Sequence, residues 1–280
     1  PVVPEVFEAV CDDAWATVLL QNVQSGDPPL SDRVRSLRII QVLPKSTPGI
    51  DRPPVGVPSG APGKQVLGTV PVEEDGSAWF RVPARTPVCF QALDERGQAI
   101  QVMRSLTYMQ PGETISCAGC HEPRTSTPAV RRMAALKKEP STIKPGPDGS
   151  KPFSYPILVQ PVLDRACVGC HSGEKPGGGV RLTGEPDGHY TVSYNALARR
   201  VPYSDQGSLQ AVSQPNQYGA RGSGLMRMLW EGHHGVELTG AELERLITWM
   251  DTNVLFYGTF KPEDQALQQK GERIAGPDLE

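Results

Sequence analysis

The chain lacks long hydrophobic runs and an excess of charge of either sign. No apolar stretch approaches the roughly 18 residues that a membrane-spanning helix needs, so we expect no transmembrane segment. The formal net charge is −3 with both signs mixed along the chain, which argues against nucleic acid or anionic lipid as a partner. Residues 1–10 show no charged segment followed by an apolar one, so no signal peptide is expected in this sequence.

Aromatic residues are also few, at 6% of the chain, whereas glycine and proline are abundant. The 29 glycines and 28 prolines among 280 residues lie well above an average combined share of roughly 12%, so we expect many loops and turns. A chain of this length can form one large domain or about two to three smaller ones, each with a core of its own.

Short runs of β-branched and aliphatic residues, each followed by turn residues, occupy the first part of the chain. They lie at residues 17–23, 36–43, 66–72, 78–82, 88–93 and 99–103. Turn residues at 73–77 and at 94–97 separate neighbouring runs, so we expect the runs on either side to form hairpins. This spacing predicts an N-terminal antiparallel β-sandwich-like domain over residues 1–115.

The second half of the chain has a different pattern, which begins after a proline-rich linker. The linker has one short expected helix at residues 129–138. Further on, residues 157–163 predict a helix that Pro161 would shorten or kink, and residues 223–230 predict another. We therefore expect an α+β protein whose residues 152–280 form a mainly α-helical domain.

The clearest helix signal starts at Thr239. Thr239 and Glu242 have the spacing of a capping box, in which each side chain bonds to the backbone of the other residue. Apolar residues follow at helical intervals up to Met250, and we expect the helix to end near Asn253.

Two Cys-x-x-Cys-His motifs stand out from this background. They are formed by Cys117, Cys120 and His121, and by Cys167, Cys170 and His171. In a chain with 6 cysteines and 5 histidines, chance would give on the order of 0.002 such motifs. A c-type haem needs two thiols about one helical turn apart for its thioether bonds and an imidazole next to them for the iron. The sequence therefore predicts two covalently bound c-type haems, with the four cysteines as attachment residues and His121 and His171 as iron ligands.

Other uses of these cysteines fit the spacing less well. A single zinc site would need both pairs, yet 46 residues separate Cys120 from Cys167, where a zinc ribbon leaves about 15 to 20. A thioredoxin-like pair would follow a strand of a βαβ unit, which neither motif does. Of the two remaining cysteines, Cys89 alternates with apolar residues in an expected strand and is interpreted as a buried thiol, while a disulfide to Cys11 is the alternative.

A second iron ligand for each haem must come from the other three histidines or from methionine. For the second haem, His233 is our first choice and His234 the second, because both lie in the loop between two expected helices. His189 follows a Pro-Asp-Gly turn and is interpreted as a solvated residue. Met226 and Met228 lie beside leucines and are interpreted as core residues.

The first haem has no evident second ligand in its sequence neighbourhood. Met103, Met109 and Met133 are near in sequence, but the first two belong to the expected strand region. We therefore expect a five-coordinate iron at the first haem, the kind of site at which small molecules bind.

Several stretches of the sequence resemble proteins related to the hydrazine synthase alpha subunit. They are residues 65–78, 103–105, 110–122, 232–238, 249–253 and 257–259. The resemblance covers nearly the whole chain and corresponds to the middle and C-terminal haem-bearing portions of that subunit, without the amino-terminal β-propeller of the family. It implies a catalytic-type first haem and an electron-relaying second haem with histidine on both faces, so that His233 would join His171.

The sequence departs from the family at the first haem. In hydrazine synthase the first iron is held by a tyrosine a few residues past the motif, and the motif histidine binds zinc. Here the next tyrosine is Tyr155, so we expect His121 to hold the iron itself.

The leading prediction is electron transfer by a di-haem c-type cytochrome in the periplasm or outside the cell. Its domains would be residues 1–115, residues 116–151 with the first haem and the linker, and a cytochrome c-like domain at residues 152–280. We expect redox partner proteins, such as other cytochrome or enzyme subunits, and an oligomer or a larger complex. Two alternatives stay open: a haem enzyme acting on a small nitrogenous or peroxidic molecule at the first haem, and a subunit that wires electrons between partners.

Overall fold

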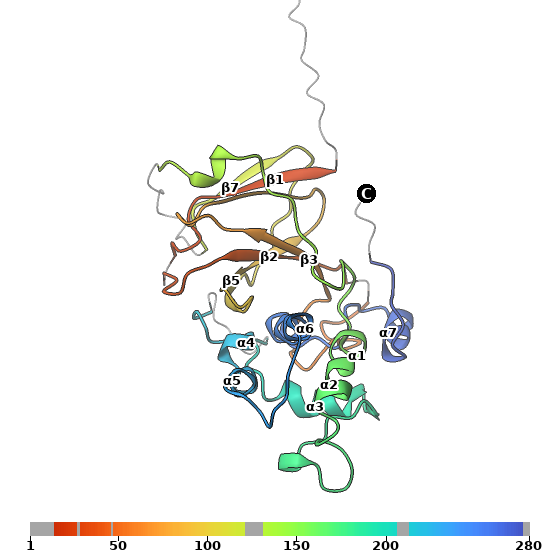
Figure 1. The fold of residues 1–280 in the computed structure, drawn as a ribbon. Helices are drawn as coiled ribbons and strands as arrows, with labels where there is room; N and C mark the ends of the chain where they lie inside the picture. Colours follow the sequence, from red (N-terminus) through yellow and green to blue (C-terminus); the bar gives the residue numbers. More distant parts are fainter. Residues whose placement is uncertain (1–13, 27–28, 46, 121–130, 206–212, 277–280) are drawn as a thin grey trace, which may run out of the picture.

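The main β-strands lie in the first half of the chain and the α-helices in the second, so the protein is α+β as expected (Figure 1). The computed structural model describes residues 14–26, 29–45, 47–120, 131–205 and 213–276. The strands of the first half are β1 (Trp15–Leu20), β2 (Ser36–Val42), β3 (Lys64–Pro71), β4 (Ala78–Pro83), β5 (Val88–Leu93), β6 (Ala99–Val102) and β7 (Thr114–Cys117).

Two sheets form the β half and share one core. One sheet has the strand order β4-β1-β7 and the other β3-β2-β5-β6. Side chains of both sheets, such as Val18 and Ile39, are buried in a single apolar cluster. The rings of Phe80 and Phe90 meet edge to face across the two layers, with centroids 5.6 Å apart. The β half therefore has the two-layer arrangement that the alternating sequence pattern predicts.

Strand pairing differs from the sequence prediction in two places. β5 and β6 form the expected hairpin, but β3 pairs with β2 while β4 pairs with β1. The turn between β3 and β4 therefore carries the chain from one sheet to the other. In addition, β7 runs parallel to β1, so the β half is not fully antiparallel. A turn sequence reverses the chain direction but leaves the pairing partner to long-range packing, which explains the difference.

The linker lies along the edges of the two sheets. Its helix η1 (Ala134–Lys137) is a single 3-10 turn, shorter than the helix expected at residues 129–138, of which residues 129 and 130 lie outside the described part. Ser141 then bridges to β4 and Lys144 to β3. These bridges occupy edge positions of both sheets that would otherwise present unpaired backbone groups.

The described residues of the second half form seven short α-helices. They are α1 (Tyr155–Leu158), α2 (Gln160–Ala166), α3 (Val192–Ala198), α4 (Gly219–Gly222), α5 (Gly224–Glu231), α6 (Gly240–Asp251) and α7 (Pro262–Gln269), with η2 (Gly177–Gly179), β8 (Pro186–Asp187) and β9 (Tyr190–Thr191) among them. The break expected at Pro161 separates α1 from α2, and Thr239 and Glu242 form the expected capping box of α6. None of the helices described here is long and apolar enough to cross a membrane.

The helical half has a core of its own, built around aromatic side chains. The Tyr155 ring stacks on Phe256 with centroids 5.5 Å apart and meets Trp249 edge-on at 5.2 Å. All three side chains are buried. The two halves of the protein therefore have separate cores, as the change in sequence pattern suggests.

A buried ion pair joins the two halves. The guanidinium of Arg38 on β2 donates to Asp251, the last residue of α6, at 3.1 Å, and to Gln91 on β5 at 2.7 Å. The Asp251 carboxylate also accepts the backbone N–H groups of Ala99 and Ala220, each at 2.9 Å. These bonds hold the end of α6 against the sheet that contains β2 and β5 (Figure 1).

Candidate functional site

The second Cys-x-x-Cys-His motif begins where α2 ends. Cys167 is the C-terminal cap of α2 and is half-buried against the helical core, while Cys170 is exposed. Backbone N–H groups of Cys170 and His171 both donate to the Cys167 carbonyl, at 3.1 and 3.0 Å. The chain thus makes one further turn, which brings both thiols and the imidazole to the same end of the helix.

A single hydrogen bond fixes the orientation of the His171 ring. Its Nδ1 lies 3.0 Å from the carbonyl oxygen of Val180, which follows η2. A carbonyl can only accept, so Nδ1 carries a proton, and in the neutral ring Nε2 then holds the free lone pair. This is the arrangement found for metal-ligating histidines, whose other ring nitrogen donates to a backbone carbonyl or a carboxylate.

His233 faces His171. The two rings are 6.0 Å apart between centroids, with 22° between their planes. Two imidazoles that bind one metal ion through nitrogen bonds of about 2 Å have centroids about 6 Å apart, so this separation fits an iron with histidine on both sides. The residues present therefore fit the c-type haem that the motif predicts.

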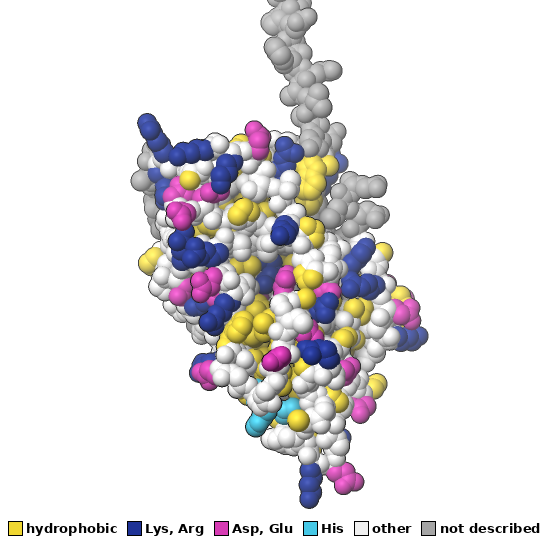
Figure 2. Space-filling view, in the orientation of Figure 1, with side chains coloured by type: hydrophobic (Ala, Val, Ile, Leu, Met, Phe, Trp, Pro, Cys, Tyr) yellow, Lys and Arg dark blue, Asp and Glu magenta, His cyan; other side chains and the backbone are white. Residues whose placement is uncertain are grey.

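The other candidate ligands of the second haem lie differently. His234 is exposed and its ring meets that of His233 edge-on at 4.6 Å. His189 is an exposed turn residue, and Met226 is fully buried in the helical core, both as expected. Histidine side chains are visible on the surface of the helical half in Figure 2.

Arg165 links the second motif to the segment that contains His233. It lies two residues before Cys167, and its guanidinium donates to the Glu242 carboxylate at 2.5 and 2.6 Å and to the Glu237 carbonyl at 3.0 Å. The bond from Arg165, together with those from Thr239, lowers the pKa of Glu242 to about 2. Arg165 therefore ties the end of α2, where the second motif begins, to the start of α6 and to the segment that follows His233. Sequence reasoning missed Arg165, because nothing near it in the chain points to a partner 77 residues away.

The first motif is held by backbone bonds of the β half. Cys117 is the last residue of β7, and its carbonyl accepts the N–H of Gln21 at 2.8 Å. The N–H of Cys120 donates to the Ser25 carbonyl at 3.0 Å. Both cysteines are half-buried against the β core, while His121 lies outside the described residues.

The surroundings of the first motif do not favour thiol chemistry. Burial, together with the nearby Cys117, raises the pKa of Cys120 to about 12, and burial also raises the pKa of Cys117. Reactive thiols in disulfide oxidoreductases have a lowered pKa instead. The pair is thus unlike a thioredoxin-type redox site.

The two cysteine pairs do not come together. Cys117 and Cys120 pack against the β core, whereas Cys167 packs against the helical core. Within the described ranges, no group of three or more cysteine, histidine or acidic side chains is arranged to hold a metal ion. Cys89 is a buried free thiol, as interpreted from its strand pattern, and Cys11 lies outside the described residues.

Four residues could be the second ligand of the first haem, and two of them lie inside the hydrophobic cores. Met109 is fully buried in the β core, and Tyr155 is fully buried in the helical core. Met103 lines a cavity between the two halves. Met133 precedes η1 and is half-buried.

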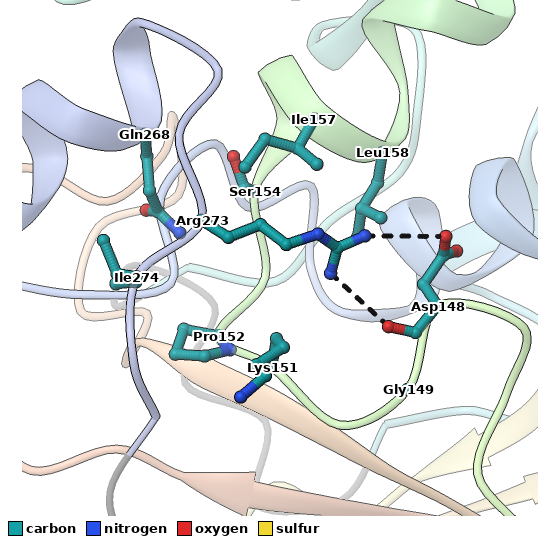
Figure 3. Close-up of a pocket in the computed structure, with 10 residues that line it drawn as sticks. All are labelled: Asp148, Gly149, Lys151, Pro152, Ser154, Ile157, Leu158, Gln268, Arg273 and Ile274. Atoms are coloured by element: carbon teal, nitrogen blue, oxygen red, sulfur yellow. Dashed lines mark hydrogen bonds and ion pairs between the residues drawn. The ribbon is translucent and has the colours of Figure 1, made fainter.

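A small hollow near the linker does not add a ligand site. It has a volume of about 20 Å³ and is lined by Asp148, Arg273 and neighbouring residues (Figure 3). The Asp148 carboxylate accepts two bonds from Arg245, at 2.8 and 2.9 Å, and lies 3.9 Å from Arg273. This volume is enough for about one water molecule, so the hollow is a packing detail between the linker and the C-terminal segment.

One known protein family matches part of this chain. Residues 32–122 match the family of the hydrazine synthase alpha subunit middle domain, a range that includes β2 to β7 and the first motif. This part of the chain is similar to the middle domain of the hydrazine synthase alpha subunit. The resemblance seen in the sequence is thereby confirmed.

The hydrazine synthase fold extends over most of the chain. A chain of Kuenenia stuttgartiensis hydrazine synthase superposes with a TM-score of 0.65 at 20% sequence identity. The superposition covers 88% of this chain and 43% of that chain, so this chain spans less than half the length of that hydrazine synthase chain. No curated protein matches the sequence.

Proposed function

We propose that this chain is a haem redox protein of the hydrazine synthase alpha type. In this proposal the second motif holds an electron-relaying c-type haem, and the first motif holds a haem at which a small nitrogenous or peroxidic molecule reacts. The observation that carries the proposal is the pair formed by His171 and His233, whose rings face each other 6.0 Å apart beside a Cys-x-x-Cys motif.

The residues of the second motif have distinct roles in this proposal. A bound c-type haem takes up and releases single electrons through its iron. Cys167 and Cys170 would hold the group by thioether bonds, and His171 and His233 would bind the iron from its two sides. Because the Val180 carbonyl fixes the His171 ring, little rearrangement is needed when the oxidation state changes. If histidines took both sides of the iron, no position would remain for a substrate, which supports a relay role in which the helical half would be a cytochrome c-like domain.

The first motif differs in the ligands around it. Cys117 and Cys120 would hold the haem, with His121 as its iron ligand. Met109 and Tyr155 are fully buried in the two cores, and Met103 lines the cavity between the two halves, so in this proposal none of the three is the second ligand. This supports an iron with one open side, where a small molecule binds and is converted.

A second candidate function is electron transfer alone. The facing pair of His171 and His233 supports it directly, because a six-coordinate haem needs no substrate. The protein would then be a di-haem cytochrome, or a subunit that transfers electrons between partner subunits. In either case we propose a site of action outside the bacterial cytoplasm, where c-type haem is attached. We also propose redox partner subunits, since the matching family is named as one subunit of an enzyme.

Two measurements on the purified protein test these proposals. The intact mass should exceed that of the polypeptide by two haems, and a mass without these additions would refute both candidates. Electron paramagnetic resonance of the oxidised protein should show one low-spin signal and one high-spin signal that changes with cyanide or nitric oxide. Two low-spin signals, unchanged by these ligands, would leave electron transfer and exclude the open first haem.

A further inference from the structure

One face of the second sheet packs into neither hydrophobic core. Pairing between β2 and its two neighbours places Lys64 opposite Val42 and Cys89 opposite Ile40. Directly paired residues, and residues two apart on one strand, share a face, so these four side chains and that of Gln91 point the same way. None of them belongs to the β core or the helical core.

This face forms one wall of a cavity between the two halves of the protein. The cavity has a volume of about 440 Å³, and its opposite wall includes Met250, Asp251 and Asn253 at the end of α6. Volumes of about 300–1,000 Å³ are typical of small-molecule sites, which also occur preferentially where domains meet. In Figure 1, α6 lies next to the sheet that contains β2 and β5.

Lys64 projects its ammonium group into this space without an acidic partner. Its Nζ donates to the Thr252 carbonyl at 3.0 Å, and no carboxylate in the described ranges forms an ion pair with it. Asp251 on the opposite wall is already bound by Arg38. An ammonium has three N–H donors, so up to two of those on Lys64 remain for a ligand.

The charges around the cavity leave an excess positive charge at Lys64. Arg104 and Asp205 also line the cavity and have opposite signs. Burial raises the pKa of Cys89, so its thiol stays neutral and cannot act as the counter-ion. Burial lowers the pKa of Lys64, because holding an unpaired ammonium away from water costs free energy. An anion bound beside Lys64 would remove that cost.

We infer that this cavity binds a small organic anion whose carboxylate pairs with Lys64 and whose apolar part lies against Ile40, Val42 and Met250. The site is distinct from both haem motifs, and the inference does not depend on the proposed redox function. An inorganic anion would pair with the Lys64 ammonium but would have no apolar part to pack against the walls of the cavity. A neutral amide would pack against these walls but would carry no charge to pair with Lys64.

Calorimetric titration of the full haem-loaded chain with butyrate, butyramide and inorganic phosphate tests this. Butyrate should bind at least about tenfold more tightly than either of the others, because butyramide lacks the charge that pairs with Lys64 and phosphate lacks the apolar chain. Equal binding of butyrate and butyramide, or tighter binding of phosphate, would overturn the inference, as would no binding of butyrate.

Variants assign the binding to Lys64. Lys64→Met should abolish butyrate binding, whereas Lys64→Arg should retain it within a few-fold. The matched control is Lys138→Met, which removes an exposed lysine paired with Glu73 and should leave binding unchanged. Lys64→Met should fold at least as well as the parent, since it removes a half-buried charge that has no acidic partner among the described residues, and a urea midpoint no lower than that of the parent checks this. Retained butyrate binding in folded Lys64→Met would contradict the assignment.

Discussion

The ion pair between Arg38 and Asp251 should be the most sensitive point at the junction of the two halves. Arg38→Met removes a guanidinium that is 4% exposed and leaves the Asp251 carboxylate, which is fully buried, without its cation. Removing one partner of a buried pair costs about 3–5 kcal/mol, against a typical total stability of about 5–15 kcal/mol. Asp251 retains two backbone donors, so we expect the lower end, about 3 kcal/mol.

Urea unfolding followed by far-ultraviolet circular dichroism measures this change. The matched control is Arg33→Met, because Arg33 and Glu74 are also 3.1 Å apart but are 49% and 92% exposed. An exposed pair contributes about 0–1 kcal/mol, so the control should be nearly neutral. A double variant, Arg38→Met with Asp251→Asn, should recover part of the loss, since no charge is left buried while the amide oxygen still accepts a backbone N–H. If Arg38→Met lowers the free energy of unfolding no more than Arg33→Met does, the ion pair between Arg38 and Asp251 does not hold the two halves together.

Three further changes have definite expected outcomes. Glu242→Gln should lower the free energy of unfolding by about 1 kcal/mol at neutral pH. The pKa of Glu242 is lowered to about 2, so the carboxylate stabilises the fold at neutral pH and this contribution is lost as the pH falls from 4.5 towards 2. The difference between the urea midpoints of the variant and the parent should shrink over that range. His233→Ala should convert one low-spin resonance signal to high-spin, whereas His234→Ala should not, and the reverse result would exchange their roles. Gly63→Ala should destabilise the protein by about 1–3 kcal/mol in the same urea assay, because its Cβ would overlap the Gly258 carbonyl oxygen, and a neutral result would contradict that close approach.

Features encoded by neighbouring residues could be predicted from the sequence. The capping box of α6 needs only Thr239 and Glu242, and the cap of α5 needs only Ser223, so both helices begin where the sequence indicates. The hairpin of β5 and β6 is equally local, because Asp94 accepts the N–H groups of the residues that follow it in the turn.

Strand partners could not be predicted in the same way. The parallel pairing of β7 with β1 joins residues about a hundred positions apart, such as Val18 and Ile115. The separation of β3 and β4 into different sheets likewise follows from which apolar faces meet in the core. A turn sequence carries no information on either point, so the sequence favours a simple antiparallel order.

The same distinction between local and long-range features applies to the candidate site. Cysteine and histidine spacing within each motif is local, and the sequence therefore names these residues, whose binding of haem stays a prediction. The choice of His233 came from its place between two helices, and the structure brings it to His171. The carbonyl of Val180 and the guanidinium of Arg165 orient this site, yet a backbone carbonyl and a surface arginine have no sequence signature. Lys64 is similarly inconspicuous, because a lysine at the start of a strand is ordinarily solvated.

The two motifs differ in how they are held, and this has a consequence for how their haems should respond to mutation. The first motif is fixed by backbone bonds from Gln21 to Cys117 and from Cys120 to Ser25, which do not depend on side chains in the helical half. The second is held by backbone bonds within its own turn and, in addition, by side chains, through Arg165 and the histidine pair. Arg165→Ala should therefore shift the redox potential and visible spectrum of one haem and leave the other unchanged, as measured by a spectroscopic redox titration. Equal shifts of both haems would mean that the two sites are coupled through the protein, and the separation of the β and helical cores would then not isolate them.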